Sequence, residues 1–130
     1  MSRSGYNDCC GGWELIRWRG AVQSATFGKR GQKLLRDMLA ALDAMPVKQL
    51  VTGELEADGN YCALGVLGKA RGIELSKIDP GDQDRVACEF DIAGALAREI
   101  VYMNDECGWR ETPEQRWIRM RNWVTKQIAP

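Results

Sequence analysis

The residues of this chain best suited to bind another molecule are cations placed beside glycine. Gly28-Lys29-Arg30-Gly31-Gln32 directly precedes a predicted helix. Backbone N–H groups at a helix N-terminus, together with two cations, can hold a phosphate or another anion. The segment lacks the spacing and the Ser or Thr of a nucleotide-binding P-loop. A solvated turn that begins a helix is the simpler interpretation, and an anion contact is the alternative.

Three aspartates, Asp79, Asp82 and Asp84, superficially match the start of a calcium-binding loop. The sequence around them lacks the glycine placement and the downstream bidentate glutamate that such a loop needs. Turn formation and helix capping therefore explain these acids more simply. On a surface that faces a partner, they would instead imitate nucleic-acid phosphates toward a basic groove.

The chain contains no histidine. This excludes Ser-His-Asp triads, Cys-His pairs and His-containing metal sites within it. A general base would have to be a carboxylate, a lysine or a cysteine with a shifted pKa, and no catalytic motif is recognisable. We therefore predict a protein that is not an enzyme and that carries no cofactor and no metal.

The five cysteines are odd in number and show no C-x-x-C spacing, which favours neither a disulfide framework nor a zinc site. Cys9 and Cys10 stand in a polar, Gly-flanked segment and are interpreted as free thiols, with oxidation or the binding of a soft metal as the alternative. Cys62 and Cys88 have apolar neighbours and are predicted to be small core residues. This cysteine usage fits a reducing cytoplasm.

The length and composition predict one domain. The chain has 130 residues, of which 45% are hydrophobic and 28% charged, as in ordinary soluble proteins. Residues 1–12 are polar and lack the apolar segment of a secretory signal, and no apolar run approaches the roughly twenty residues that span a bilayer. We expect a polar arm over 1–12, a single helical domain over 13–130 and no membrane contact.

Apolar residues three and four positions apart predict a mostly α fold of five or six helices. The pattern is strongest from Lys29 or Gln32 to Met45, and Pro46 ends it because the residue before a proline avoids the helical region. Further helices are expected over 13–24, 62–71, 83–90 and 92–104. Asp82 and Asp91 are the predicted N-caps of the last two helices, and Gly72 is the predicted left-handed cap after 62–71. Glycines within 62–71 are expected to let a neighbouring backbone approach.

The last helix has a clear start, because Thr112, Pro113 and Gln115 combine a capping-box spacing with proline at the first helical position. The segment from Val47 to Tyr61 has two equal interpretations. Residues 49–52 form a strand that returns after a turn at 58–60, or residues 47–58 form a short helix. The fold class is accordingly mostly α with one small β-hairpin as an option.

Charge is distributed unevenly along this chain of zero net charge. Residues 1–36 hold seven basic and two acidic residues, 37–109 six basic and fourteen acidic, and 110–130 five basic and two acidic. If the two ends meet in space, they form a basic face opposite an acidic one. All five tryptophans lie in or beside the basic segments, and arginine with tryptophan is typical of interface hot spots. Tryptophans that fasten the terminal helices together explain the pattern equally well.

Several segments together resemble a family of small phage and prophage proteins. They include Trp18-Arg19-Gly20, Gly28-Lys29-Arg30-Gly31-Gln32, Cys62-Ala63-Leu64-Gly65, Asn104-Asp105-Glu106 and Thr112-Pro113-Glu114-Gln115-Arg116-Trp117. The resemblance covers nearly the whole chain and implies a phage accessory protein acting in a bacterial cytoplasm. Small phage proteins of this kind often resemble anti-defence factors, including anti-CRISPR proteins, which bind and block a host protein.

The charge pattern and the resemblance give two hypotheses. The first is a phage-encoded protein that binds and inhibits a host protein or ribonucleoprotein complex, such as a CRISPR-Cas defence system. The alternative is a small nucleic-acid-binding accessory protein that uses the same basic ends. The residues predicted to contact the partner are Trp18, Arg19, Lys29, Arg30, Arg116 and Arg119 on the basic side, and Asp79, Asp82 and Asp84 on the acidic side.

Overall fold

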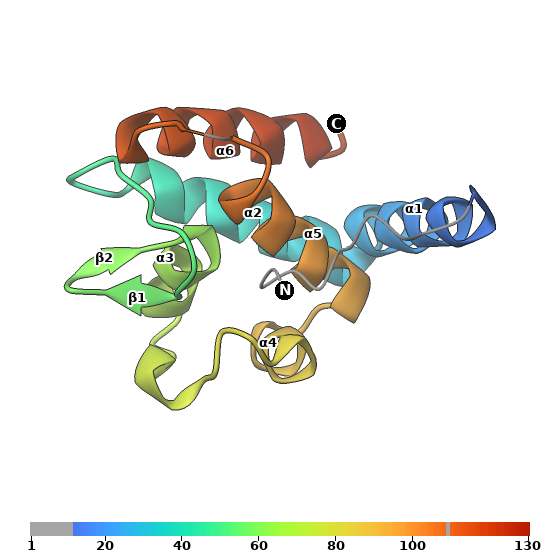
Figure 1. The fold of residues 1–130 in the computed structure, drawn as a ribbon, viewed down its shortest axis with the longest axis horizontal. Coiled ribbons are helices and arrows are strands. Elements are labelled where there is room, and N and C mark those ends of the chain that lie inside the picture. The colour runs from blue at the N-terminus through green and yellow to red at the C-terminus, as the bar shows by residue number, and fades with distance from the viewer. Residues whose placement is uncertain (1–11, 109) are drawn as a thin grey trace.

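The computed structural model describes residues 12–108 and 110–130, with side chains from Trp18 onward. The predicted arm up to residue 11, with Cys9 and Cys10, lies outside the described residues. The described chain forms six α-helices, one short 3-10 helix and one two-stranded hairpin (Figure 1). Their bounds are α1 Gly12–Phe27, α2 Lys29–Asp43, β1 Glu56–Ala57, β2 Asn60–Tyr61, α3 Ala63–Ala70, η1 Leu75–Lys77, α4 Gln83–Phe90, α5 Gly94–Asp105 and α6 Pro113–Gln127. The prediction of one mostly helical domain with a small hairpin is confirmed.

Helix α2 lies at the centre of the domain, with α6 along one side and α3 along another (Figure 1). Its predicted apolar stripe is its buried face, because Leu34, Leu35, Met38 and Leu42 are fully buried in the core. The opposite face of α2 remains in solvent. The helix stops before Pro46, as predicted. Helix α2 therefore offers an exposed row of side chains on a rigid support.

The segment between α2 and α3 forms the hairpin and not the alternative helix. Strands β1 and β2 pair antiparallel, with Glu56 opposite Tyr61. Asp58 and Gly59 between them both have positive φ, 51° and 81°, which is the conformation of a type I′ turn. The predicted strand at 49–52 does not form. The N–H of Val51 does donate to the carbonyl oxygen of Tyr61 at 3.0 Å, but the N–H of Leu50 donates to the carbonyl oxygen of Pro113 at 3.1 Å, so the pairing does not extend.

The predicted roles of glycine in and after α3 are confirmed. A Cβ on Gly65 would lie 1.8 Å from the carbonyl oxygen of Leu55, so only glycine allows this close approach. Gly72 has a φ of +75°, and the N–H of Ile73 donates to the carbonyl oxygen of Gly68 at 2.9 Å. This pattern ends the helix in the expected left-handed cap.

Two expectations around α4 and α5 are wrong. Asp91 does not cap the start of α5, which begins at Gly94; it ends α4 in the left-handed conformation, with φ 53°. Its N–H donates to the carbonyl oxygen of Cys88 at 3.2 Å, and aspartate is among the few non-glycine residues that adopt this conformation readily. Cys88 is exposed, because it lies on the outer face of α4, whereas Cys62 is buried as predicted.

Helix α6 begins as predicted. The Thr112 side chain accepts from the N–H of Gln115 at 3.1 Å, and the Gln115 side chain accepts from the N–H of Thr112 at 2.9 Å. This reciprocal capping box satisfies N–H groups that a helix start leaves without partners. Trp117 is buried, and its indole N–H donates to the carbonyl oxygen of Leu42 at 3.2 Å. Trp117 therefore fastens α6 to the end of α2.

Candidate docking surface

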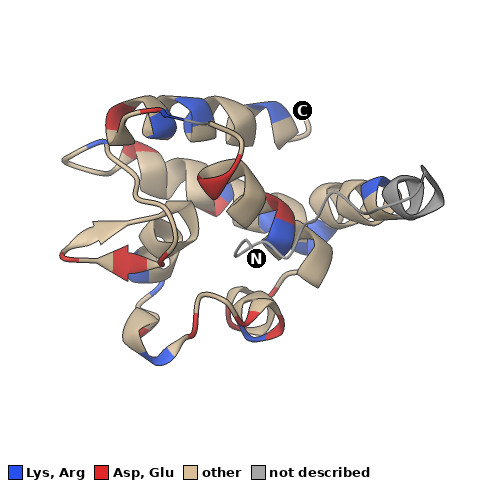
Figure 2. Ribbon diagram, in the orientation of Figure 1, with Lys and Arg blue, Asp and Glu red and all other residues tan. Residues whose placement is uncertain are grey.

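The described parts of the two basic segments, within residues 12–36 and 110–130, meet in space. Helix α6 packs on α2, and Gln32 on α2 donates to the carbonyl oxygen of Gln127 at 3.0 Å. Figure 2 shows Lys and Arg along α6 and around the junction of α1 and α2, and Asp and Glu on α4. The condition for a basic face is therefore met. Which of its cations are available to a partner depends on their contacts within the domain.

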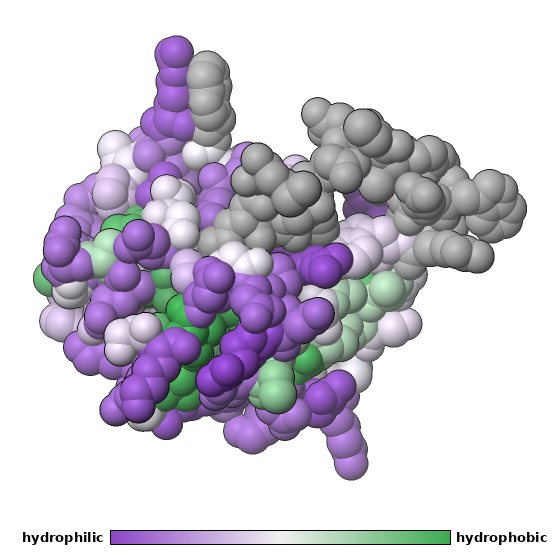
Figure 3. Space-filling model, turned by 60° about the horizontal axis from the view of Figure 1, so that its bottom comes forward, coloured by the Kyte–Doolittle hydropathy of each residue, from purple (hydrophilic) through white to green (hydrophobic). Residues whose placement is uncertain are grey.

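The acidic side centres on η1 and α4, where residues 74–91 hold six acidic and two basic residues. Two of the three predicted aspartates have local structural contacts. Asp79 accepts from the N–H of Gly81 at 2.9 Å, and Asp82 caps α4 by accepting from the N–H of Arg85 at 3.1 Å. Asp84 is exposed in the first turn of α4. The face that includes α4 is mostly hydrophilic, with apolar atoms visible in a narrow band (Figure 3).

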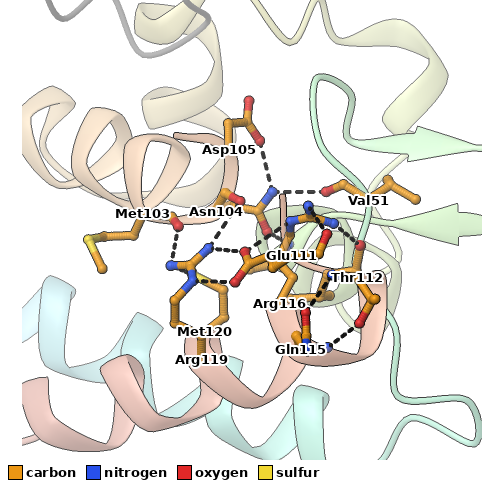
Figure 4. Close-up of polar contacts among 12 residues, drawn as sticks. Val51, Met103, Asn104, Asp105, Glu111, Thr112, Gln115, Arg116, Arg119 and Met120 are labelled. Atoms are coloured by element: carbon orange, nitrogen blue, oxygen red, sulfur yellow. Dashed lines mark hydrogen bonds and ion pairs between the residues drawn. The ribbon is translucent and has the colours of Figure 1, made fainter. Parts of the chain in front are cut away.

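Arg116 and Arg119 point into the domain, toward Glu111 (Figure 4). Arg119 binds both carboxylate oxygens of Glu111, at 2.9 and 2.5 Å, and donates to the carbonyl oxygen of Met103 near the end of α5 at 2.5 Å. Hydrogen bonds from Arg119 to Glu111 raise the pKa of this guanidinium. A cation beside the last carbonyls of α5 also suits the helix dipole.

The second arginine ties a loop to the same carboxylate. Arg116 Nε lies 3.3 Å from Glu111 Oε1 without an aligned hydrogen bond, and its guanidinium donates to the carbonyl oxygen of Leu50 at 2.9 Å. Only 12% of the side-chain surface of each partner is exposed. Glu111, Arg116 and Arg119 therefore join α5, α6 and the segment before the hairpin. Little of the surface of either arginine remains exposed to a partner.

Buried between these elements, Asn104 completes the junction. Its side-chain amide donates to the carbonyl oxygen of Val51 at 2.9 Å, and its side-chain oxygen accepts from the N–H of Ala63 at 3.1 Å. Neither Asn104 nor Glu111 was predicted as a structural centre, because nothing in the local sequence indicates which distant groups their side chains bind.

The remaining predicted residues of the basic side lie along α1 and α2. Trp18 is half-buried, and the Arg98 guanidinium lies 6.0 Å from the centre of its ring, a cation–π contact. Arg19 and Lys29 are exposed. Arg30 is exposed and forms an ion pair with Asp91 at 3.2 Å.

A groove of about 430 Å³ lies where α1 turns into α2. We call it the elbow groove; its lining residues are Phe27, Gly28, Lys29, Gln32, Lys33, Arg36 and Asp37. Phe27 exposes 51% of its surface, a large fraction for an aromatic residue. Lys29, Lys33 and Arg36 are exposed at helical positions i, i+4 and i+7, so they form one row along α2. We call this row the α2 ridge.

The elbow groove is held in shape from beneath. A Cβ on Gly31 would lie 2.0 Å from the carbonyl oxygen of Ala25, so glycine lets α2 pass directly against α1. Gln32 is buried and donates to the carbonyl oxygen of Thr26 at 2.8 Å. It also accepts from the N–H of Ala129 at 2.8 Å. These contacts fix the two helices and the end of α6 to one another.

The charge of the elbow groove is positive with one acidic edge. Hydrogen bonds from Lys33 and Arg71, each 2.9 Å long, hold the pKa of Asp37 below its ordinary value. Arg36 donates to a backbone carbonyl, that of Ala129, at 3.2 Å. Neither Lys29 nor Arg36 has a carboxylate partner among residues 18–108 and 110–130. The α2 ridge therefore keeps most of its charge.

Of the exposed residues of the elbow groove, Lys29 was predicted from the sequence, whereas Phe27, Lys33 and Arg36 were not. The signal was present, since Lys29, Lys33 and Arg36 repeat at helical spacing on the side of α2 opposite its apolar stripe. Phe27 carries no comparable signal, because a phenylalanine at the end of a helix is more often buried.

The described residues contain no group of three side chains of the metal-ligand types that could hold a metal ion. In the same part of the chain, every helix is too short or too polar to cross a membrane. Comparison of the chain with protein-family models, curated proteins and solved structures finds no significant match.

Proposed function

We propose that this protein is a non-catalytic binding protein that docks onto a partner protein complex through the elbow groove. The observation that carries the proposal is the α2 ridge, three exposed cations beside the exposed ring of Phe27 on a rigid support. Exposed phenylalanine and arginine are residue types enriched at interfaces, and the two lysines add charge that steers and orients a partner of opposite charge.

The contacts of the other cations support this choice of surface. Arg116 and Arg119 bind Glu111, and Arg121 binds Asp43 at 2.6 Å. A charge already paired within the domain must give up that pair before it can contact a partner. Lys33 of the α2 ridge is paired with Asp37, but Lys29 and Arg36 have no carboxylate partner among the described residues, so the ridge needs less rearrangement than Arg116, Arg119 and Arg121 of α6.

The class of partner follows from the resemblance to small phage proteins. It supports a phage-encoded protein that acts in a bacterial cytoplasm, where it binds and inhibits a host complex, for example a CRISPR-Cas defence system. The positive charge of the α2 ridge supports recognition of a negatively charged surface on the partner. Charges at the edge of an interface mainly speed up and orient association.

The test is affinity capture from a bacterial host lysate with three forms of the tagged protein. One is unchanged. The second carries Lys29→Glu, Lys33→Glu and Arg36→Glu. The third, a matched control, carries Lys69→Glu, Lys77→Glu and Arg85→Glu, which change the net charge equally at exposed positions outside the groove.

We expect the unchanged protein and the control to retain the same stoichiometric protein partner, and the ridge variant to lose it. Circular dichroism spectra must show that all three forms are folded. Retention of the partner by the folded ridge variant would contradict the proposal, as would the absence of any stoichiometric partner.

A further inference from the structure

The α2 ridge has the geometry to match one regular structure in a partner. Lys29, Lys33 and Arg36 stand at i, i+4 and i+7 on a single α-helix. At a rise of 1.5 Å per residue, the row extends about 10 Å along the helix axis. Glutamates at i, i+4 and i+7 of a second helix would form a row of the same length.

The groove beside the ridge adds an apolar contact. Phe27 precedes Lys29 by two residues and lines the same groove at the start of the row, and half of its surface is exposed. An apolar side chain near the first glutamate of the partner helix would cover this ring. The surface thus fits a helix with one acidic stripe and an apolar residue at one end of it.

The lining of the elbow groove disfavours a nucleic-acid strand. Asp37 lies in the groove lining, and Asp91 is paired with Arg30 close to the start of α2. These carboxylates would repel the phosphates of a nucleic acid and the glutamates of a helix alike, so they do not distinguish the two ligands. Stacking does distinguish them, because single-strand binding surfaces stack successive bases on several aromatic side chains, whereas Phe27 is the one aromatic residue in the lining of this groove.

We propose that the elbow groove binds an acidic amphipathic helix of the partner protein, with its carboxylates opposite Lys29, Lys33 and Arg36 and an apolar side chain against Phe27. This inference rests on the proposed function and specifies the kind of surface that the partner presents. Because the three cations are exposed, each ion pair contributes modestly. The match of all three positions gives the specificity.

The experiment measures fluorescence anisotropy of a labelled, alanine-rich helical peptide of about twenty residues with the full chain. The peptide carries glutamates at i, i+4 and i+7 and a leucine before the first. A control peptide has the same composition, with its glutamates spread around the helix. A third probe is an oligothymidine strand of about twenty nucleotides.

We expect the ordered peptide to bind about tenfold more tightly than the control peptide. Lys33→Glu should abolish this preference, and a peptide whose central glutamate is replaced by lysine should restore binding to Lys33→Glu. Restored binding after the charges of Lys33 and its glutamate partner are exchanged would show a specific pair, because a non-specific attraction of the peptide to the cations would not produce it. Phe27→Ala should weaken binding of the ordered peptide several-fold.

Equal binding of the two peptides, or no rescue by the exchanged pair, would overturn the helix proposal. Tighter binding of the oligothymidine than of either peptide would also overturn it, in favour of a nucleic-acid ligand. These failures are separable from failure of the proposed function. If the lysate partner still depends on the α2 ridge while the peptides fail, the function stands and the partner presents a different acidic surface.

Discussion

Glu111 and Arg119 form a two-point ion pair inside the domain, with Arg119 Nε at 2.9 Å from one carboxylate oxygen and its terminal nitrogen at 2.5 Å from the other. The carboxylate lies directly beneath Gly108, where a Cβ would be 2.2 Å from the carboxyl carbon. Arg116 approaches the same carboxylate from α6. One acid therefore holds two arginines together, and its removal leaves two largely enclosed positive charges close to each other.

We expect Glu111→Gln to lower the free energy of unfolding by about 2–3 kcal/mol, because breaking an enclosed ion pair leaves charge without compensation. Asp43→Asn, which breaks the more exposed pair with Arg121, should have a much smaller effect. Urea denaturation of both variants measures the difference. Similar losses in the two variants would show that Glu111 is no more important than a surface acid.

The elements of this fold were predictable wherever local sequence determines the structure. Helix α2 follows from its apolar spacing, and α6 from its capping box at Thr112. The turn at Asp58 and Gly59 belongs to a type that favours these residues. In each case neighbouring residues carry the whole signal, so no knowledge of the tertiary structure is required.

The candidate site was only partly predictable, because long-range partners decide which charges remain available. Arg116 and Lys29 are both cations in basic segments of the sequence. In the structure, Arg116 is enclosed with Glu111 and Lys29 is exposed. Cys88 was assigned to the core from its apolar neighbours and is exposed, because the buried face of α4 runs through Val86, Ala87 and Phe90. Such outcomes depend on packing between segments far apart in the chain.

Asp91 provides a test of the left-handed end of α4. We expect Asp91→Val to lower the free energy of unfolding by about 1–2 kcal/mol, because a β-branched residue is strained at a φ of 53°. Asp91→Gly should be neutral or slightly stabilising, since glycine adopts this conformation without strain. Both variants lose the exposed pair with Arg30, so their difference in thermal unfolding isolates the backbone effect. Equal stability of the two variants would exclude it.

Because of Asp37, we expect the free energy of unfolding to depend on pH in the acidic range. Its pKa in the folded protein is lowered from the ordinary value of 3.8 by Lys33 and Arg71. The unfolded state therefore binds the proton more readily, so the stabilisation is complete above the ordinary value and is lost as the pH falls through the lower folded pKa. We expect Asp37→Asn to reduce the melting temperature at pH near 7, and the gap from the unchanged protein to close below about pH 3–4.

The measurement for Asp37 is thermal unfolding across this pH range for the unchanged protein, Asp37→Asn and Lys33→Met. Lys33→Met removes the larger cause of the lowered pKa, so its pH dependence in acid should be weaker than that of the unchanged protein. A gap between the unchanged protein and Asp37→Asn that stays constant with pH would contradict this assignment.

Gly31 tests the rigid support of the elbow groove. A Cβ at this position would lie 2.0 Å from the carbonyl oxygen of Ala25 and 2.9 Å from that of Thr26, and backbone atoms cannot move aside without separating α1 from α2. We expect Gly31→Ala to lower the free energy of unfolding by about 2–3 kcal/mol. Gly20→Ala is the matched control: it lies within α1 with nothing near its Cβ and should raise stability by about 0.5–1 kcal/mol.

The same pair of variants connects the elbow to binding. Separation of α1 from α2 would move Phe27 away from the α2 ridge, so folded Gly31→Ala should bind the ordered acidic peptide more weakly than Gly20→Ala does. Peptide titration at a temperature where both variants are folded measures this. If Gly31→Ala is destabilised but binds with unchanged affinity, the ridge alone recognises the peptide, and the position of Phe27 relative to the ridge has no part in recognition.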